Sequence, residues 1–479
     1  MRPLGWGVVS RYFQPDAGLA GRRTERRETA SHRTLLGQTD VRASTDALAV
    51  AGHGGTARSL WRTGEPTLDD AYEVPDEEFA EPDIAPDRPM RDVEVRILPG
   101  LREYSWRAAH AASSRKTTVI VWGFDADSAA NIDRPQYFWN IINDCDFVTA
   151  LTDQCNTDVR LLIPLDTRCS VRTNARYLHT YLEDLQREPD IGAVHVIGLS
   201  LGGLIAKYAL QMMQGNTPLI RTYISYDTPH RGANVPLSVQ YFLDYMHVCN
   251  TDAEEKLTLL VNSEAAREAC FYHYTEWWRD SVAPRRDGMR TALLADYARM
   301  ARNGRLLDHI PQRCAISNGN EAERFAEGTL LGVFDIAPNQ IGSGWLGDGR
   351  FRAIGRGVCV IDVRIACVRN RWQADIGSAV PLDGMGGGTK DFISLLLCHV
   401  KQGSAVFGLD FCSAFRPVKE PVCFIPYASA LDRAVGGFSD PLEEGSRIAF
   451  TRTFAMDRST PHLSINVPIR EFIKDCVRG

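Results

Sequence analysis

Ser200 has the surroundings that point most directly to chemistry, because it lies in "VIGLSLGGLIAKY", between Gly198 and Gly202. A serine hydroxyl is a weak nucleophile at neutral pH, so it needs a base to accept its proton and donors to hold an oxyanion. Small residues two positions before and after the serine allow a sharp strand-to-helix turn that exposes the hydroxyl. We interpret Ser200 as a candidate nucleophile, and a structural Gly-rich turn is the alternative.

Two backbone amides are candidates for the oxyanion site. If a helix begins after Ser200, the amide of Leu201 belongs to its first turn, where N–H groups have no partner within the helix. A second donor is expected from the loop after an earlier strand, and the sequence "VWGFD" favours the amide of Phe124. This chemistry requires no metal and no organic cofactor, and we expect none.

The base of such a site is expected late in the chain, after the acid. His462, in "RSTPHLSINVPI", lies in a Pro-containing loop between a strand-like run, residues 448–454, and a final helical pattern. It is the candidate base, and an ordinary surface-loop histidine is the alternative. We expect His230 to shape the pocket wall or to form structural hydrogen bonds, and His195 to pack within a strand.

The acid that orients the base has several candidates, since it should follow the carboxyl end of a strand. Asp227 ends "RTYISYD", 27 positions after Ser200, and Asp432 follows the later strand-like run "CFIPYASALD". Asp227 is the first choice and Asp432 the alternative; Asp410 and Glu420 are further candidates. A purely structural role for Asp227, as a cap of the turn "DTPHRG", also stays open.

The elements that must position these residues alternate between strand and helix. Short apolar strand patterns cover residues 117–125, 158–166 and 221–227, and another precedes Ser200. Amphipathic helical patterns lie between them, for example over residues 174–188. Strands separated by helices of this length imply right-handed crossovers and parallel pairing. We therefore predict an α/β fold with a largely parallel central sheet.

The rest of the chain divides by composition. Residues 1–90 are rich in polar residues and then in acidic residues and prolines, which predicts a disordered or low-complexity tail. Residues 91–479 are expected to form the α/β domain. Within it, residues 236–310 have helical spacing and predict a cap region, whereas residues 311–425 are β-like and interrupted by glycines, which predicts a β-rich insertion.

Composition excludes some classes of partner. The net charge of −6 and a pI near 6.0 make nucleic acid an unexpected partner. We find no apolar run near the roughly 18 residues that span a bilayer, and no apolar signal core at the start. Twelve cysteines favour disulfides in a secreted or periplasmic protein, while no CxxC spacing suggests a metal site. The localisation therefore stays open.

These motifs together resemble the α/β-hydrolase superfamily of serine esterases and lipases. The chain is most similar to a bacterial lipase-like group that has a "GFD" strand end, a "GxSxGG" elbow, a "DxPHxGANxPL" segment and a "FIPxxSALD" segment. Here they are residues 123–125, 198–203, 227–237 and 424–432. The resemblance covers residues 92–479, and it implies Ser200 as the nucleophile and His462 as the base.

One position departs from this pattern. Many lipases have their acid about four residues before the proline of a "VPxxS" segment, and the matching residue here is Val422. The resemblance therefore favours Asp227 or Asp432 as the acid.

The leading functional hypothesis is a serine hydrolase that cleaves carboxylic esters of lipid or acyl type. The alternatives are an acyltransferase or thioesterase with the same triad, and a non-catalytic interaction protein that keeps the scaffold. Apolar and aromatic stretches at residues 239–248 and 271–278 are candidates for a lid or acyl pocket, or for ordinary helix core. The expected partner is a small-molecule or lipid ester, with peripheral contact to a lipid surface as an open possibility.

Overall fold

A computed structural model describes most of the chain after residue 88. The described residues are 89–109, 114–124, 131–235, 239–240, 243–244, 257–276, 287–301, 305–323, 330–336, 347–354, 358–365, 368–375, 385–390, 392, 415–416, 422–434, 445 and 447–479. The predicted tail therefore lies almost wholly outside the described residues.

The central sheet contains eight strands of the described chain, in the order β1-β2-β4-β3-β5-β6-β7-β15. Strand β2 is antiparallel to both β1 and β4, and all the following neighbours are parallel. The strands are β1 (Glu94–Leu98), β2 (Leu101–Trp106), β3 (Arg115–Val121), β4 (Thr157–Pro164), β5 (Ile191–Leu199), β6 (Ile220–Tyr226), β7 (Gln312–Ser317) and β15 (Arg452–Ala455). The predicted α/β class with a largely parallel sheet is confirmed.

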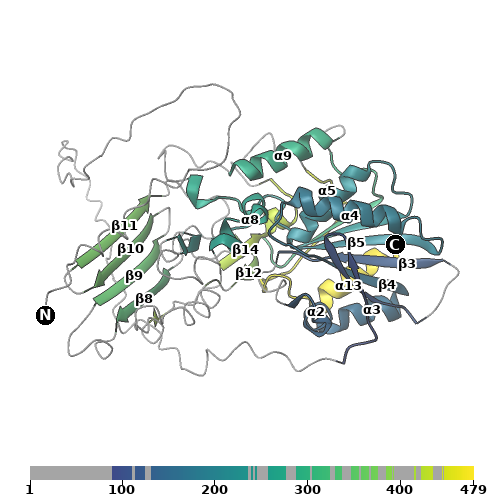
Figure 1. Ribbon diagram of the computed structural model, residues 1–479, viewed down its shortest axis with the longest axis horizontal. Coiled ribbons are helices and arrows are strands. Elements are labelled where there is room, and N and C mark those ends of the chain that lie inside the picture. The colour runs from purple at the N-terminus through teal and green to yellow at the C-terminus, as the bar shows by residue number, and fades with distance from the viewer. Residues whose placement is uncertain are drawn as a thin grey trace, which may run out of the picture. The chain divides into compact units, whose positions relative to one another are not determined.

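Helices cover both faces of this sheet (Figure 1). Those described are α2 (Pro135–Ile142), α3 (Phe147–Gln154), α4 (Val171–Leu185), α5 (Leu201–Met213), α8 (Glu264–Ala269), α9 (Gly288–Met300), α11 (Tyr427–Ala430) and α13 (Val467–Arg478). Short 3-10 turns occur at Asp144–Asp146 and Tyr274–Glu276, and a π-helical turn at Leu257–Val261. The sequence analysis did not predict helices α2 and α3.

The core consists of two apolar layers, one on each face of the sheet. Helices α4, α5, α8 and α9 contribute to one layer, and α2, α3 and α13 contribute to the other. Helix α4 starts where the sequence provides a cap, because the Ser170 side chain accepts a hydrogen bond from the Thr173 amide. Asn466 caps α13 in the same way through the Ile469 amide, directly after the loop that contains His462.

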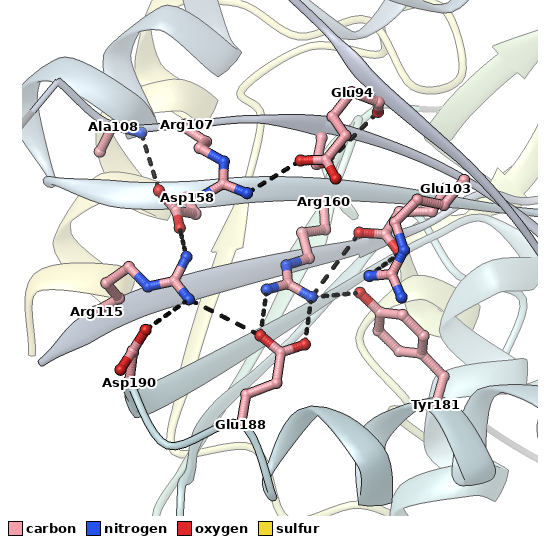
Figure 2. A network of polar contacts seen from close by, with 12 residues as sticks. Glu94, Glu103, Arg107, Ala108, Arg115, Asp158, Arg160, Tyr181, Glu188 and Asp190 are labelled. Carbon is pink, nitrogen blue, oxygen red and sulfur yellow. Dashed lines mark hydrogen bonds and ion pairs between the residues drawn. The ribbon is translucent and has the colours of Figure 1, made fainter. Parts of the chain in front are cut away.

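A network of charged side chains lies at the end of the sheet where strands β3 and β4 begin (Figure 2). Arg160, on β4, forms a two-pronged contact with Glu188, at 3.0 and 2.8 Å. Arg115 lies 3.1 Å from Asp158 and 3.5 Å from Asp190. Because β3, β4 and β5 are parallel, the turn after β5 lies at the opposite end of these strands.

The predicted β-rich insertion differs from the structure at its start. Its first strand, β7, belongs to the central sheet between β6 and β15. A separate antiparallel sheet follows in the order β11-β10-β9-β8-β13, with β8 (Leu330–Ile336), β9 (Gly347–Ile354), β10 (Val358–Ile365), β11 (Val368–Asp375) and β13 (Phe415–Arg416). A third sheet pairs β12 (Gly387–Lys390) with β14 (Val422–Pro426). The sequence missed the assignment of β7 because a buried strand reads alike in either sheet.

The described cysteines are free thiols, namely Cys145, Cys155, Cys169, Cys270, Cys314, Cys423 and Cys476. The other five, at positions 249, 359, 367, 398 and 412, lie outside the residues whose side chains are described. No helix in the described segments combines the length and the apolar character needed to cross a membrane.

Candidate active site

The turn between β5 and α5 holds Ser200 in a conformation that side chains rarely adopt, with φ at 52° and ψ at −125°. Close backbone packing explains the glycines around it. A Cβ atom on Gly198 would lie 2.4 Å from the Cα of Gly203, and one on Gly202 would lie 2.2 Å from the carbonyl oxygen of Val121. The sharp turn thus depends on residues without side chains, as expected for a nucleophile elbow.

His462 joins Ser200 to Asp227. Its Nε2 atom lies 2.9 Å from Ser200 Oγ, and its Nδ1 atom lies 2.6 Å from Asp227 Oδ2. A carboxylate only accepts hydrogen bonds, so Nδ1 carries the proton that it donates to Asp227. Nε2 is then free to accept the Ser200 hydroxyl proton. Ser200 and His462 are 262 positions apart along the chain.

Asp227 is fully buried, and backbone groups hold it in place. It follows β6 with φ at 47°, and its own amide donates to the carbonyl oxygen of Ile316 at 2.8 Å. The amide of Asn318 donates to Asp227 Oδ1 at 3.2 Å. Gly388, on β12, passes so close that an added Cβ would lie 2.0 Å from Oδ2. These contacts hold the carboxylate beside His462.

The loop that carries His462 is fastened to β12. The His462 amide donates to the carbonyl oxygen of Thr389, and the Thr389 amide donates to that of Thr460, at 2.8 and 3.0 Å. The Phe424 ring meets the imidazole edge to face, with 5.0 Å between ring centroids and 86° between ring planes. These contacts fix the orientation of the imidazole between its two partners.

Asp432, the alternative acid, lies apart from this site in a buried ionic cluster. Its carboxylate accepts a hydrogen bond from the Ile448 amide at 2.8 Å. It also lies 3.4 Å from Arg231 and 4.0 Å from Lys207, both of them buried. The carboxylate that accepts the hydrogen bond from His462 is therefore that of Asp227. Asp410 and Glu420 lie outside the described residues.

The other two histidines considered have structural surroundings. His230 is buried, and its Nε2 lies 2.7 Å from Ser225 Oγ. Burial lowers its pKa well below the usual value, and the nearby cations Lys207, Arg231 and Arg290 lower it further. His195 lies on β5, where burial lowers its pKa to about 4. In the structure, the histidine that forms the hydrogen bond with Ser200 is His462, and not His230 or His195.

The residues of the two expected oxyanion donors line the same cavity as Ser200. Leu201 is the first residue of α5, so its amide is one of the N-terminal amides that the helix itself leaves without an acceptor. Phe124 follows β3, the neighbour of β5 in the sheet, and both residues line the same cavity as Ser200. Gly123 keeps this loop close, since a Cβ there would lie 2.9 Å from Ser200 Cβ.

A cavity of about 520 Å³ opens at Ser200 and His462. One wall comes from the chain between β6 and β7, which contributes mainly small and aliphatic side chains: Val239, Leu243, Leu260, Val261, Ala266 and Ala269. Val239 and Leu243 belong to the stretch predicted as lid or acyl pocket; the other residues of that stretch from 241 to 248, apart from Asp244, lie outside the described residues. The pocket suits an apolar substrate group beside a reactive hydroxyl.

Sequence reasoning missed β12 as a part of the site. Gly388 and Thr389 support Asp227 and His462, yet they precede the histidine by more than 70 positions. The run of three glycines at residues 386–388 was the available signal, because glycine in a strand indicates close approach of another backbone or side chain. Phe424 was included only as part of the "FIPxxSALD" segment, without a contact to His462.

Comparisons with known proteins do not identify the chain. No protein-family model matches the sequence, and no curated protein matches it. Solved structures with a similar fold include the mature lipase BlEst2 of Bacillus licheniformis, with 16% identity and a TM-score of 0.29, over 46% of this chain and 72% of that one. An arylesterase follows at 12% identity and a TM-score of 0.30, over 50% and 69%.

The esterase of Pyrobaculum calidifontis is similar at 12% identity and a TM-score of 0.28, over 49% of this chain and 68% of that one. These neighbours are esterases and lipases, but at such values the likeness carries no argument about activity. The chemistry is therefore argued from the geometry of Ser200, His462 and Asp227.

Proposed function

We propose that this protein is a serine hydrolase that cleaves carboxylic esters through Ser200, His462 and Asp227. The observation that carries the proposal is the continuous hydrogen-bonded chain from Ser200 Oγ to His462 and on to the buried carboxylate of Asp227. This order of nucleophile, base and acid is the one that activates a serine. The chain order, serine before acid before histidine, is also that of hydrolases with a nucleophile elbow.

In the first half-reaction, His462 Nε2 accepts the Ser200 proton while Oγ attacks the ester carbonyl. Asp227 stabilises the imidazolium that forms and keeps the proton on Nδ1. The amides of Leu201 and Phe124 donate to the oxyanion of the tetrahedral intermediate. His462 then gives its proton to the leaving alcohol, which leaves an acyl group on Ser200.

In the second half-reaction, water takes the place of the alcohol. His462 accepts a proton from the water, the hydroxide attacks the acyl carbonyl, and the carboxylic acid departs as Ser200 regains its proton. The cavity beside Ser200 is lined mostly by apolar side chains, which favours substrates with an apolar acyl group. We therefore infer acyl esters, including lipid esters, as the substrate class.

Labelling by a fluorophosphonate probe tests the proposal, because such a probe phosphonylates an activated serine. Wild-type protein should be labelled at Ser200, as identified by peptide mass spectrometry, and should hydrolyse p-nitrophenyl acyl esters. Ser200→Ala should abolish both signals, whereas Ser114→Ala, at an exposed serine before β3, should retain both. Folded wild-type protein that is neither labelled nor active would refute the proposal and support the non-catalytic alternative.

A further inference from the structure

Two thiols from distant parts of the chain meet inside the core. Cys314, on β7, and Cys476, on α13, have their sulfur atoms 3.1 Å apart, and both residues are fully buried. They are 162 positions apart. Both belong to the apolar layer that α13 forms with the sheet. Because a disulfide requires about 2.05 Å between the sulfurs, a shift of roughly 1 Å separates this contact from a covalent bond.

We propose that Cys314 and Cys476 form a disulfide that fastens the last helix to the central sheet. Each partner lies beside a part of the candidate active site. Strand β7 leads directly to Asn318, whose amide donates to Asp227, and α13 begins five residues after His462. The bond closes a loop that contains the separate antiparallel sheet, β12 and the His462 loop. It therefore links α13 to β7, which is the neighbour of β6 in the sheet, and Asp227 follows β6.

The chemistry is thiol–disulfide exchange with a small-molecule disulfide such as oxidised glutathione. A thiolate is the form that attacks a disulfide, so the exchange begins when one of the two thiols, here Cys476, loses its proton. Cys476 Sγ attacks one sulfur of the oxidant, forming a mixed disulfide and releasing one glutathione thiolate. Cys314 Sγ, after losing its proton, attacks Cys476 Sγ and releases the second. Two protein thiols are oxidised and one disulfide of the oxidant is reduced to two thiols.

Burial of both sulfurs places this reaction before α13 packs, during folding. The folded core then shields the bond from reductants. Among the described residues, Cys476 Sγ is the sulfur that lies in contact with Cys314 Sγ, at 3.1 Å. The disulfide therefore has one defined partner on each side.

Peptide mapping of the full chain tests the proposal directly. The protein is unfolded, refolded with a glutathione redox buffer, blocked with iodoacetamide under denaturing conditions and digested without reduction. The expected result is a cross-linked peptide that contains Cys314 and Cys476. Recovery of both cysteines as carbamidomethyl derivatives from correctly refolded protein would overturn the proposal.

A stability measurement gives a second, independent result. Reductant present during refolding should lower the Tm of wild-type protein by about 5 °C, because the open chain gains loop entropy when unfolded. Cys314→Ser should show the lower Tm with and without reductant, whereas Cys169→Ser should behave as wild type. Equal Tm values for oxidised and reduced wild-type protein would count against the bond, whatever the hydrolase assay reports.

Discussion

His462 Nδ1 lies 2.6 Å from Asp227 Oδ2, within a cage of backbone groups around the carboxylate. The amide of Asn318 and the backbone of Gly388 form two sides of this cage. The relationship assigns different work to two aspartates that the sequence offers as alternatives. In the proposed mechanism Asp227 orients the base, whereas Asp432 lies beside the buried cations Lys207 and Arg231.

Asp227→Asn should lower kcat for p-nitrophenyl ester hydrolysis by roughly 10⁴-fold, because an amide in this position favours the wrong imidazole tautomer. The fold should persist, since the two side chains have nearly the same shape. Steady-state kinetics at a temperature well below the Tm measure the effect. Asp432→Asn serves as the comparison, and an equally large loss of kcat in folded Asp432→Asn would contradict the assignment of the acid.

Asp432→Asn should instead reduce the free energy of unfolding by about 3 kcal/mol, because it leaves buried Lys207 and Arg231 with one carboxylate fewer. Urea unfolding measures the change. Asp308→Asn is the control, since Asp308 lies at the surface, 3.9 Å from Arg313, and such pairs contribute about 0.5 kcal/mol. An equal decrease in the free energy of unfolding for both substitutions would show that the buried Asp432 cluster stabilises the protein no more than a surface ion pair does.

Gly388→Ala should lower kcat at least 100-fold, because the new Cβ would overlap Asp227 Oδ2 and displace the carboxylate from His462. The estimate follows from the cost of a displacement of about 1 Å in a catalytic group. Gly288→Ala, in the first turn of α9, is the matched control, since an added Cβ there meets nothing within 4 Å. Wild-type kcat in Gly388→Ala would mean that β12 does not constrain the acid.

Ala269→Phe should shift the preferred acyl chain toward shorter esters, because Ala269 lines the cavity beside Ser200 and a phenyl ring fills part of it. A series of p-nitrophenyl esters from acetate to palmitate measures the shift as a ratio of kcat/KM values, expected to change by about tenfold or more. Ala292→Phe, on the exposed face of α9, is the control. An unchanged chain-length profile in Ala269→Phe would place the acyl group elsewhere.

His195 makes stability depend on pH. Its pKa is lowered to about 4 in the folded protein, chiefly by burial, and is about 6.5 in the unfolded chain. Between these values the unfolded chain binds more protons, so stability falls as the pH falls from 6.5 to 4. His195→Leu should remove about 2 kcal/mol of the difference in unfolding free energy between pH 8 and pH 5.

Urea unfolding at both pH values measures this difference for wild type and variant. His179→Gln is the control, because His179 is only partly buried on α4. The same pH dependence in wild type and His195→Leu would show that another group accounts for acid destabilisation. His230, also buried with a lowered pKa, is expected to supply the remaining part.

Local patterns in the sequence determined the elements of the core. The apolar run before Ser200 and the amphipathic run after it predicted β5, α5 and the turn between them, because periodicity and glycine report directly on local backbone geometry. The alternation of strands and helices also determined the parallel sheet. Hence the sequence alone was sufficient to predict a candidate nucleophile and an α/β fold.

The tertiary structure decided which distant groups meet. In the sequence both Asp227 and Asp432 follow strand-like runs. In the structure both have positive φ, although Asp432 comes just after the helix α11. No pattern in the sequence therefore distinguishes the two. Only the packing of β12 and the His462 loop against the end of β6 brings one carboxylate, and not the other, to the imidazole. Likewise, cysteine spacing along the chain could not pair Cys314 with Cys476, because contact across 162 positions arises from the docking of α13 and not from any sequence period.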